Sequence, residues 1–312
     1  MKDILTAATR PGRLAVAQTE IVIAAIKRIY PDIKIEIKKV TTAGDTDRRT
    51  ALWSLKTSGF FTSRVEDVLL AGEADFAVHS FKDLPTGQRE GLSIAAVCER
   101  GFVEDCVITA EPADSMTALK RCAKIGTSSP RRAAQIRHLR KDVEIEAVRG
   151  NVQRRLSLVA AGKVDAVILA RAGMERLGLG ENISFSFDPA QFIPAAAQGA
   201  LAVQTRADND EVRKLLAAID EPKTRAATFA ERQILVTTKC GCHGPVGAFA
   251  QVSGSQINIR AFVSDLEGEN LIVKTITGAV SEAPEQAEKL AIELLEAGGG
   301  EILKKLTKRY EN

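Results

Sequence analysis

The sequence predicts an α/β protein with two similar doubly wound halves, followed by a smaller α+β domain that contains an antiparallel sheet. Three observations predict this fold class. Short apolar strands alternate with helical periodicity through the first two thirds of the chain, as in parallel sheets covered by helices. Aromatic residues make up only 4% of the 312 residues, so Ala, Val, Ile and Leu must fill the core. After about Glu221, short alternating strands take over.

The elements of the first half follow from this periodicity. Ile4–Ala8 is predicted as a strand, and Leu14–Ile29 as a helix that Pro31 ends. A strand over Ile33–Val40 precedes a polar loop, Thr41–Arg49. The remaining elements are a helix over Phe61–Ala71 and buried strands over Ala74–Ser80 and Leu92–Cys98.

The same alternation then restarts in the second half and gives way to the third domain. The second half is predicted to contain a helix near Ser115–Arg121, strand Lys124–Gly126, helix Pro130–Leu139, strand Val143–Val148, helix Val152–Ala161 and strand Ala166–Ala170. The third domain is predicted to contain helix Lys223–Leu235, strands Phe249–Val252, Ile257–Val263 and Leu271–Ile276, and the amphipathic helix Glu282–Ala297. We therefore expect domain 1 over residues 1–98 with 196–217, domain 2 over 99–195 and domain 3 over 218–312.

The composition favours a soluble cytoplasmic protein. A net charge of +3 is too small to indicate a nucleic-acid or membrane partner by itself, and no apolar run is long enough for a signal peptide or a membrane span. Five cysteines in so long a chain fit a reducing compartment better than a disulfide framework. Three of them, Cys98, Cys106 and Cys122, sit in apolar segments and are predicted to lie in the core.

Arginine and lysine concentrate in the middle of the chain. From Arg121 to Arg176 there are 13 Lys or Arg against 5 Asp or Glu, and ten of the 13 are arginine. In open α/β sheets, ligands bind beyond the carboxyl ends of the strands. Polar residues follow five predicted strands at this position: Thr9 with Arg10, Lys82 with Asp83, the segment TSSPRR (127–132), the segment RGNVQRR (149–155), and Arg171 with Arg176.

The segment TSSPRR has the features of an anion-binding helix start. Ser129 is predicted as an N-cap with Pro130 at the first helical position, so free backbone N–H groups face any anion there. Arg131 and Arg132 add guanidinium forks that can hold carboxylates in bidentate fashion. Asn151 is predicted to cap the next helix in the same way, between Arg149 and Arg155. The alternative is that these arginines are solvated charges with surface partners.

Other ligand classes fit less well. The sequence has no P-loop, no GxGxxG and no acidic pair to hold Mg²⁺, and the basic segments lack the aromatic residues that stack on bases. Cys240, Cys242 and His243 have no second cluster to complete a metal site, so we predict no metal. Many arginines on several loops instead suit a substrate that carries many carboxylates.

Two residues suggest covalent or cationic chemistry. Asp83 is a carboxylate among cations; it either pairs with Lys82, caps a helix, or stabilises positive charge developing on a substrate. Cys242 lies between glycine-rich segments, a position suited to a covalent attachment point or a nucleophile, although an ordinary thiol is the alternative.

Together these motifs resemble the hydroxymethylbilane synthase (porphobilinogen deaminase) family. The resemblance covers nearly the whole chain in order, and HSFKDLP and GTSSPRR are its most specific parts. The matching segments are ATR (8–10), HSFKDLP (79–85), CER (98–100), GTSSPRR (126–132), RGNVQRRL (149–156), DAVILARAGMERLGL (165–179), PAAAQGA (194–200), AER (230–232) and GCHGPVG (241–247).

The resemblance implies a fold and a reaction. The first two domains are expected to resemble periplasmic binding proteins, with the active cleft between them. A dipyrromethane cofactor would be held by a thioether to a cysteine of the third domain, and Cys242 matches that position whereas Cys240 does not. Four porphobilinogen units would be added in turn, each losing ammonia, before water releases the linear tetrapyrrole. We also expect a monomer that binds neither nucleic acid nor membranes.

The resemblance also implies residue roles. Asp83 matches the catalytic carboxylate, which would assist the loss of ammonia and stabilise the resulting cation. The positions that match cofactor contacts are Lys82, Ser129, Arg131, Arg132, Arg155 and Arg176. Those that match contacts to the substrate or growing chain are Arg10, Arg149, Phe61 and Gln198.

The chain departs from the family pattern at three places. Gly12 stands where the family generally has serine, Ser58 replaces the lysine of a GGKGLF loop that here reads KTSGFF (56–61), and Ala197 replaces the glycine before QGA. Two alternatives therefore stay open. One is a non-catalytic anion-binding protein of the periplasmic-binding type; the other is a divergent relative that assembles the cofactor but turns over poorly.

Overall fold

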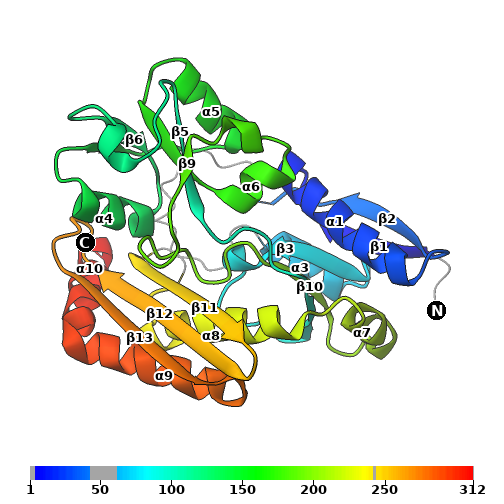
Figure 1. The fold of residues 1–312 in the computed structure, drawn as a ribbon. Coiled ribbons are helices and arrows are strands. Elements are labelled where there is room, and N and C mark those ends of the chain that lie inside the picture. The colour runs from blue at the N-terminus through cyan, green and yellow to red at the C-terminus, as the bar shows by residue number, and fades with distance from the viewer. Residues whose placement is uncertain (1–3, 43–61, 242–243, 312) are drawn as a thin grey trace.

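The first sheet belongs to an α/β body at the N-terminal end (Figure 1). The structure is a computed structural model that describes residues 4–42, 62–241 and 244–311. The sheet has five strands in the order β2-β1-β3-β10-β4. Their bounds are Ile4–Thr9 (β1), Lys34–Lys39 (β2), Phe76–Ser80 (β3), Leu92–Val97 (β4) and Leu201–Arg206 (β10).

The second sheet repeats this arrangement in the order β7-β6-β8-β5-β9. The strands are Asp105–Thr109 (β5), Lys124–Gly126 (β6), Glu144–Glu146 (β7), Ala166–Ala170 (β8) and Phe185–Ser186 (β9). The sheets are mixed rather than parallel throughout, because β10 and β5 each run antiparallel to both of their neighbours, whereas the other pairs are parallel as predicted. Both strands enter their sheets directly after the chain crosses between the two halves, so no crossover helix turns them parallel.

Helices cover both sheets. The first body contains α1 (Arg13–Ile29), α3 (Ser63–Leu70) and α7 (Asp210–Ala217), and the second contains α4 (Pro130–Leu139), α5 (Val152–Ala160) and α6 (Arg171–Arg176). The helix predicted near Ser115–Arg121 is wrong: only a single 3₁₀ turn, Met116–Ala118, forms there. Aliphatic side chains from α1 and α7 pack on one face of the first sheet, including Val22, Ile26 and Leu216.

The C-terminal domain is a three-stranded antiparallel sheet covered by helices on one face (Figure 1). Its strands are Val246–Ser253 (β11), Gln256–Ser264 (β12) and Leu271–Ala279 (β13), and its helices are Pro222–Thr238 (α8), Ala283–Leu294 (α9) and Gly300–Glu311 (α10). Alanines of α8 and α9, such as Ala230 and Ala287, let the helices approach the sheet closely. The helix predicted over Glu282–Ala297 does not end there, because the chain bends at Gly298 (φ 110°) and continues as α10.

The fold class predicted from the sequence, two α/β halves and a smaller α+β domain, is confirmed. β4 ends at Val97 and β10 begins at Leu201, so the first sheet takes strands from both sides of the second. The exact limits of the three domains stay a prediction. Within the described ranges, no helix combines the length and apolar character that a membrane crossing needs.

Candidate active site

Helices α4 and α5 begin just after the loops that follow β6 and β7, as predicted. Ser129 caps α4 and its hydroxyl accepts a hydrogen bond from the Arg132 amide at 3.4 Å, with Pro130 in the first turn. Asn151 caps α5 and accepts from the Arg154 amide at 2.9 Å. Both N-cap predictions are confirmed, and each cap sets the direction of the arginines that follow it.

The arginine pair after Ser129 is turned into the protein. Arg131 donates to Asp105 Oδ2 at 2.7 Å and to the Ile193 carbonyl at 2.7 Å. Arg132 donates to Asp105 Oδ1 through Nε at 3.0 Å and Nη2 at 2.7 Å, and to the Ile168 carbonyl at 2.9 Å. Burial opposes the ionisation of Asp105, but the two guanidinium groups outweigh it and hold the pKa of this carboxyl well below its usual range.

Lys82 and Gln198 extend this network toward the first sheet. Lys82 Nζ donates to Gln198 Oε1 at 3.1 Å, and Gln198 Nε2 donates to Asp105 Oδ1 at 3.0 Å and to the Val103 carbonyl at 2.8 Å. Burial and the charge of Arg132 lower the pKa of Lys82 to about 8. Gln198, expected to contact substrate, is fully buried and bonded at both ends of its amide.

Arg149 and Arg155 complete a cationic cluster around Asp83. Arg155 Nε donates to the Gly150 carbonyl at 3.0 Å, and burial, with the charges of Arg132 and Arg149, lowers its pKa to about 10. The charge of Asp83 acts in the opposite direction on Arg155, so the two side chains lie within electrostatic reach. The Nη1 atom of Arg149 is buried and has no hydrogen-bond partner among the described residues.

The charges of this cluster do not balance. Among the described residues, electrostatic contacts connect five cations (Lys82, Arg131, Arg132, Arg149 and Arg155) with two carboxylates (Asp83 and Asp105), and these seven groups carry a net charge of +3. In the part of the chain that the structure describes, Lys82, Arg149 and Arg155 form no salt bridge. Such a concentration of partly buried positive charge suits an anionic ligand.

Asp83 is exposed at the end of a short 3₁₀ turn, Phe81–Asp83, that follows β3. The buried ring of Phe81 anchors this turn, and the guanidinium of Arg232 lies 4.5 Å from the ring centroid. Arg232, on α8, donates to the carbonyls of Phe81 at 3.2 Å, Leu84 at 3.0 Å and Pro85 at 2.5 Å. A helix of the third domain thus fixes the loop that carries Asp83.

Arg176 and Arg10 are two further arginines of the predicted site. Arg176 donates to the Gly199 carbonyl at 2.5 Å, and burial lowers its pKa to about 10. Arg10 acts on the buried His79, the pKa of which is lowered to about 4, first by burial.

Some predicted residues lie outside the described ranges, namely Cys242, Phe61 and Ser58. Of the other departures, Gly12 is the N-cap residue of α1, and a Cβ added there would meet none of the described atoms within 4 Å. Ala197 is fully buried with φ +61°, a conformation that favours glycine.

The cysteines in apolar segments behave differently from one another. Cys98 and Cys106 are buried as predicted, and burial raises the pKa of each thiol to about 12. The prediction is wrong for Cys122, which is exposed in a turn before β6 with φ +54°. Charged residues, Lys120, Arg121 and Lys124, surround Cys122 in the sequence, and the turn leaves its side chain exposed.

Sequence reasoning missed Asp105, Arg232 and Glu231. Asp105 begins a strand that was not predicted, and its partners Arg131 and Arg132 are 26 and 27 residues away. Glu231 is fully buried; it pairs with Arg100 at 2.7 Å and accepts the Ala197 amide. Glu231 and Arg232 stand in the AER segment, so the match to that segment was the available signal.

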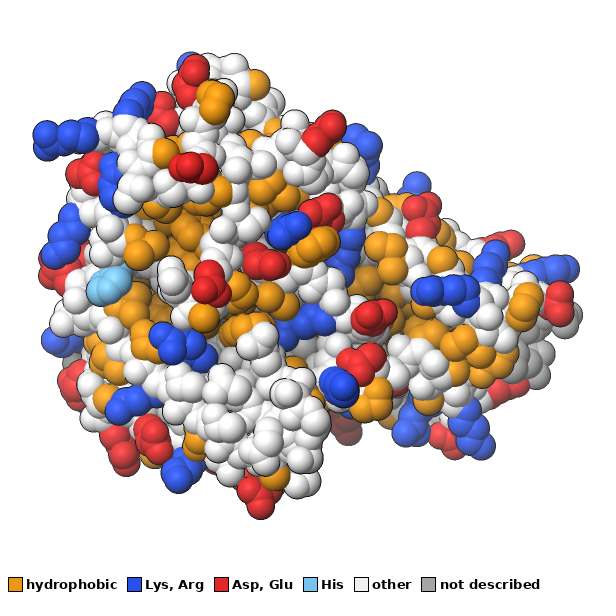
Figure 2. Space-filling model, in the orientation of Figure 1, with side chains coloured by type: hydrophobic (Ala, Val, Ile, Leu, Met, Phe, Trp, Pro, Cys, Tyr) orange, Lys and Arg blue, Asp and Glu red, His pale blue; other side chains and the backbone are white. Residues whose placement is uncertain are grey.

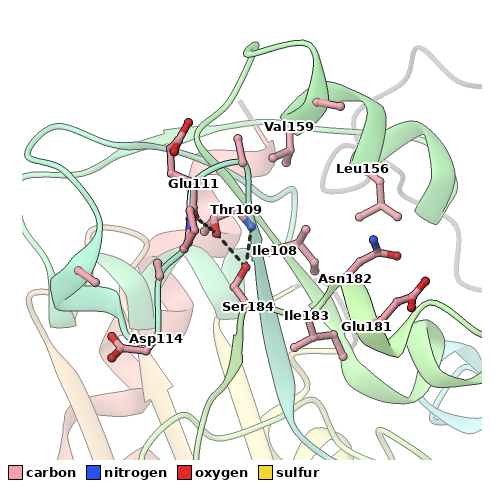
Figure 3. Close-up of a pocket in the computed structure, with 15 residues that line it drawn as sticks. Ile108, Thr109, Glu111, Asp114, Leu156, Val159, Glu181, Asn182, Ile183 and Ser184 are labelled. Atoms are coloured by element: carbon pink, nitrogen blue, oxygen red, sulfur yellow. Dashed lines mark hydrogen bonds between the residues drawn. The ribbon is translucent and has the colours of Figure 1, made fainter.

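A separate large pocket lies on the second body (Figure 3). Its volume is about 1070 Å³, and it is lined by β5, α5 and the segment 181–184. The acidic side chains that line it are Glu111, Asp114 and Glu181. Its described lining residues include neither lysine nor arginine. This acidic lining would repel a polycarboxylate. On the face drawn in Figure 2, basic side chains are scattered among acidic ones.

Comparisons with known proteins agree with the motifs. The model of the porphobilinogen deaminase dipyrromethane cofactor-binding domain matches residues 5–214, and that of the porphobilinogen deaminase C-terminal domain matches residues 226–297. Among solved structures, a TRAP periplasmic solute binding protein from Desulfovibrio salexigens superposes on 70% of this chain, over 73% of its own length, with 10% sequence identity and a TM-score of 0.42.

Curated relatives match over almost the entire chain. The porphobilinogen deaminase of Desulforudis audaxviator is 40% identical over 303 residues, which are 97% of this chain and 98% of the relative. The porphobilinogen deaminase of Syntrophobacter fumaroxidans is 37% identical with the same coverage. The chain therefore belongs to the porphobilinogen deaminase family.

Proposed function

We propose that this chain is a hydroxymethylbilane synthase that condenses four porphobilinogen molecules on a dipyrromethane bound to Cys242 and then releases the linear tetrapyrrole. The observation that carries the proposal is the cluster of Lys82, Arg149 and Arg155 around Asp83, which form no salt bridge within the described residues. An anion-binding site alone has no use for a carboxylate at its centre, whereas a reaction that develops positive charge does.

The residues fit a dipyrromethane, the pyrrole rings of which bear acetate and propionate groups. The buried Nη1 of Arg149 has no hydrogen-bond partner in the described part of the chain, and a carboxylate oxygen would satisfy it. Arg155 and Lys82 would bind further carboxylates, and each charge-assisted hydrogen bond contributes roughly 1.5–3 kcal/mol. When bound, the dipyrromethane supplies the terminal pyrrole carbon to which each new unit is joined. Ser129, Arg131, Arg132 and Arg176 are assigned to the same cofactor through the family match.

Asp83 would stabilise the positive charge that develops on porphobilinogen as ammonia leaves. A carboxylate ~4 Å from a unit positive charge contributes about 4 kcal/mol at an effective dielectric near 20. That magnitude matters here, since the surrounding net charge of +3 would otherwise oppose the formation of a cation. The hold of Arg232 on the loop keeps the Asp83 carboxylate in place.

Arg10, Arg149 and Phe61 are assigned to the incoming substrate and the growing chain, again through the family match. We further propose that the protein works as a monomer in the cytoplasm. Size-exclusion chromatography with light scattering would test the monomer, since a dimer mass contradicts it.

The experiment that tests the proposal is Asp83→Asn. The variant keeps the shape of the side chain but removes the charge, so we expect the cofactor adduct to remain and elongation to stall. The fall in turnover would be about 10²–10³-fold, the usual effect of losing one transition-state electrostatic contact. Asp114→Asn is the matched control, because Asp114 lies at the acidic pocket away from the cluster. Normal turnover in Asp83→Asn would contradict the assigned mechanism.

A further inference from the structure

Asp105 is the buried carboxylate that accepts from the arginine pair of the cluster, and it has no role in the family match. It is fully buried at the first position of β5 and receives hydrogen bonds from Arg131, Arg132 and Gln198. Its two oxygens are divided between the arginines, with Oδ2 bound to Arg131 and Oδ1 to Arg132. Rotation of the carboxylate would break bonds to both guanidinium groups, so Asp105 fixes the orientation of each relative to the other.

Gln198 connects this carboxylate to the other half of the molecule. Lys82 follows β3 of the first sheet, whereas Asp105 begins β5 of the second, and the side chain of Gln198 bridges them. The orientation of the Gln198 amide is determined by its partners. Lys82 can only donate and the Asp105 carboxylate can only accept, so Oε1 must face Lys82 and Nε2 must face Asp105.

The bridge has an electrostatic effect as well as a geometric one. Lys82 lies next to Asp83, and the charges of Asp83 and Asp105 both favour its protonated form against burial and the nearby arginines. Removing the charge of Asp105 would therefore alter both the geometry of the arginine pair and the ionisation of Lys82.

We propose that Asp105 and Gln198 are positioning residues of the reaction: Asp105 orients Arg131 and Arg132, and Gln198 ties Lys82 to them across the two halves. This inference rests on the proposed function. Neither side chain would touch substrate, because both are fully buried and their polar atoms are bonded within the protein. Each acts on substrate through the cations that it holds, in contrast to the direct contact that the family match assigns to Gln198.

The test compares three variants of the full-length protein with the wild type: Asp105→Asn, Gln198→Met and, as a control, Asp220→Asn. Asp220 also pairs with an arginine, Arg225, at 2.8 Å, and it accepts the Val97 amide of β4. Turnover of porphobilinogen is measured as a function of substrate concentration and pH, and folding is monitored by circular dichroism.

For Asp105→Asn we expect KM to rise by at least about tenfold, since an arginine misplaced by ~1 Å loses that much or more. The alkaline limb of the kcat/KM profile should move to lower pH by about one unit, because Lys82 loses a neighbouring negative charge. For Gln198→Met we expect KM to rise about tenfold while the alkaline limb stays in place, since the charges are unchanged. Asp220→Asn should match the wild type in both measurements.

The outcomes separate the inference from the proposed function. A wild-type protein without turnover and without adduct would overturn the proposed function itself. If the wild type is active and Asp105→Asn has the same KM and pH profile as the wild type, only the positioning role is overturned. If Asp105→Asn does not fold, Gln198→Met decides, because it leaves the buried ion pairs intact: a folded Gln198→Met with wild-type KM contradicts the inference.

Discussion

Arg232→Met tests whether the third domain holds the catalytic loop in place. The wild-type guanidinium donates to the carbonyls of Phe81, Leu84 and Pro85 and lies over the Phe81 ring. Methionine retains much of the apolar contact but provides no donor, so three carbonyls of the loop lose their partner. A buried acceptor left without a donor costs about 1–3 kcal/mol, so losing the donor to three carbonyls should cost about 3 kcal/mol or more. Total stabilities are typically about 5–15 kcal/mol, so this would be a large share.

The same substitution should slow the reaction. The loop carries Asp83, and a displacement of ~1 Å can lower turnover by about 10²-fold. Urea unfolding gives the change in the free energy of unfolding, and porphobilinogen consumption gives kcat. Arg213→Met is the control, because Arg213 is exposed, pairs with the neighbouring Asp210 and should change stability by no more than about 0.5 kcal/mol. A loss below about 1 kcal/mol with unchanged kcat in Arg232→Met would refute the reasoning.

Three further predictions concern stability. Ala197→Gly relieves the strain of a positive φ, which costs about 1–2 kcal/mol. The variant also loses a buried methyl group and gains entropy in the unfolded state, so the free energy of unfolding should change by less than about 1 kcal/mol. A larger change, measured by chemical denaturation, would contradict this balance. The pKa of His79 is about 4 in the folded protein and 6.5 in the unfolded chain, so the unfolded chain takes up a proton first as the pH falls. The free energy of unfolding should therefore fall by about 2–3 kcal/mol from pH 7 to 4.5. His79→Gln should flatten this pH dependence, and an unchanged slope would contradict the argument. Gly268→Ala would place a Cβ against the Ala134 carbonyl at a positive φ, and should cost more than about 2 kcal/mol by thermal unfolding, whereas a wild-type Tm would contradict that contact.

Periodicity and local capping rules predicted much of the fold. Ser129 and Asn151 cap their helices as expected because an N-cap needs only the residues next to it. The strands that precede Lys82, Arg131 and Arg149 were also predicted from local pattern, so the loops of the cationic cluster could be identified in advance.

What the sequence could not show depends on distant partners. A buried arginine and a solvated one look alike in sequence, and only the partner Asp105 on an unpredicted strand turns Arg131 and Arg132 inward. The antiparallel β10 was missed for a similar reason, since it joins its sheet only after the chain has completed the second one. The run of glycines at 298–300 looks like a helix end, whereas the chain bends there and continues as α10.

The central claim is that Cys242 carries a dipyrromethane made from substrate, and the intact mass of the protein tests it most directly. The chain is expressed in a host that makes porphobilinogen and is weighed beside Cys242→Ser and Cys240→Ser. We predict an added mass the size of two linked pyrroles in the wild type and in Cys240→Ser, and none in Cys242→Ser. An unmodified wild-type chain, or an adduct that persists in Cys242→Ser, would contradict the account.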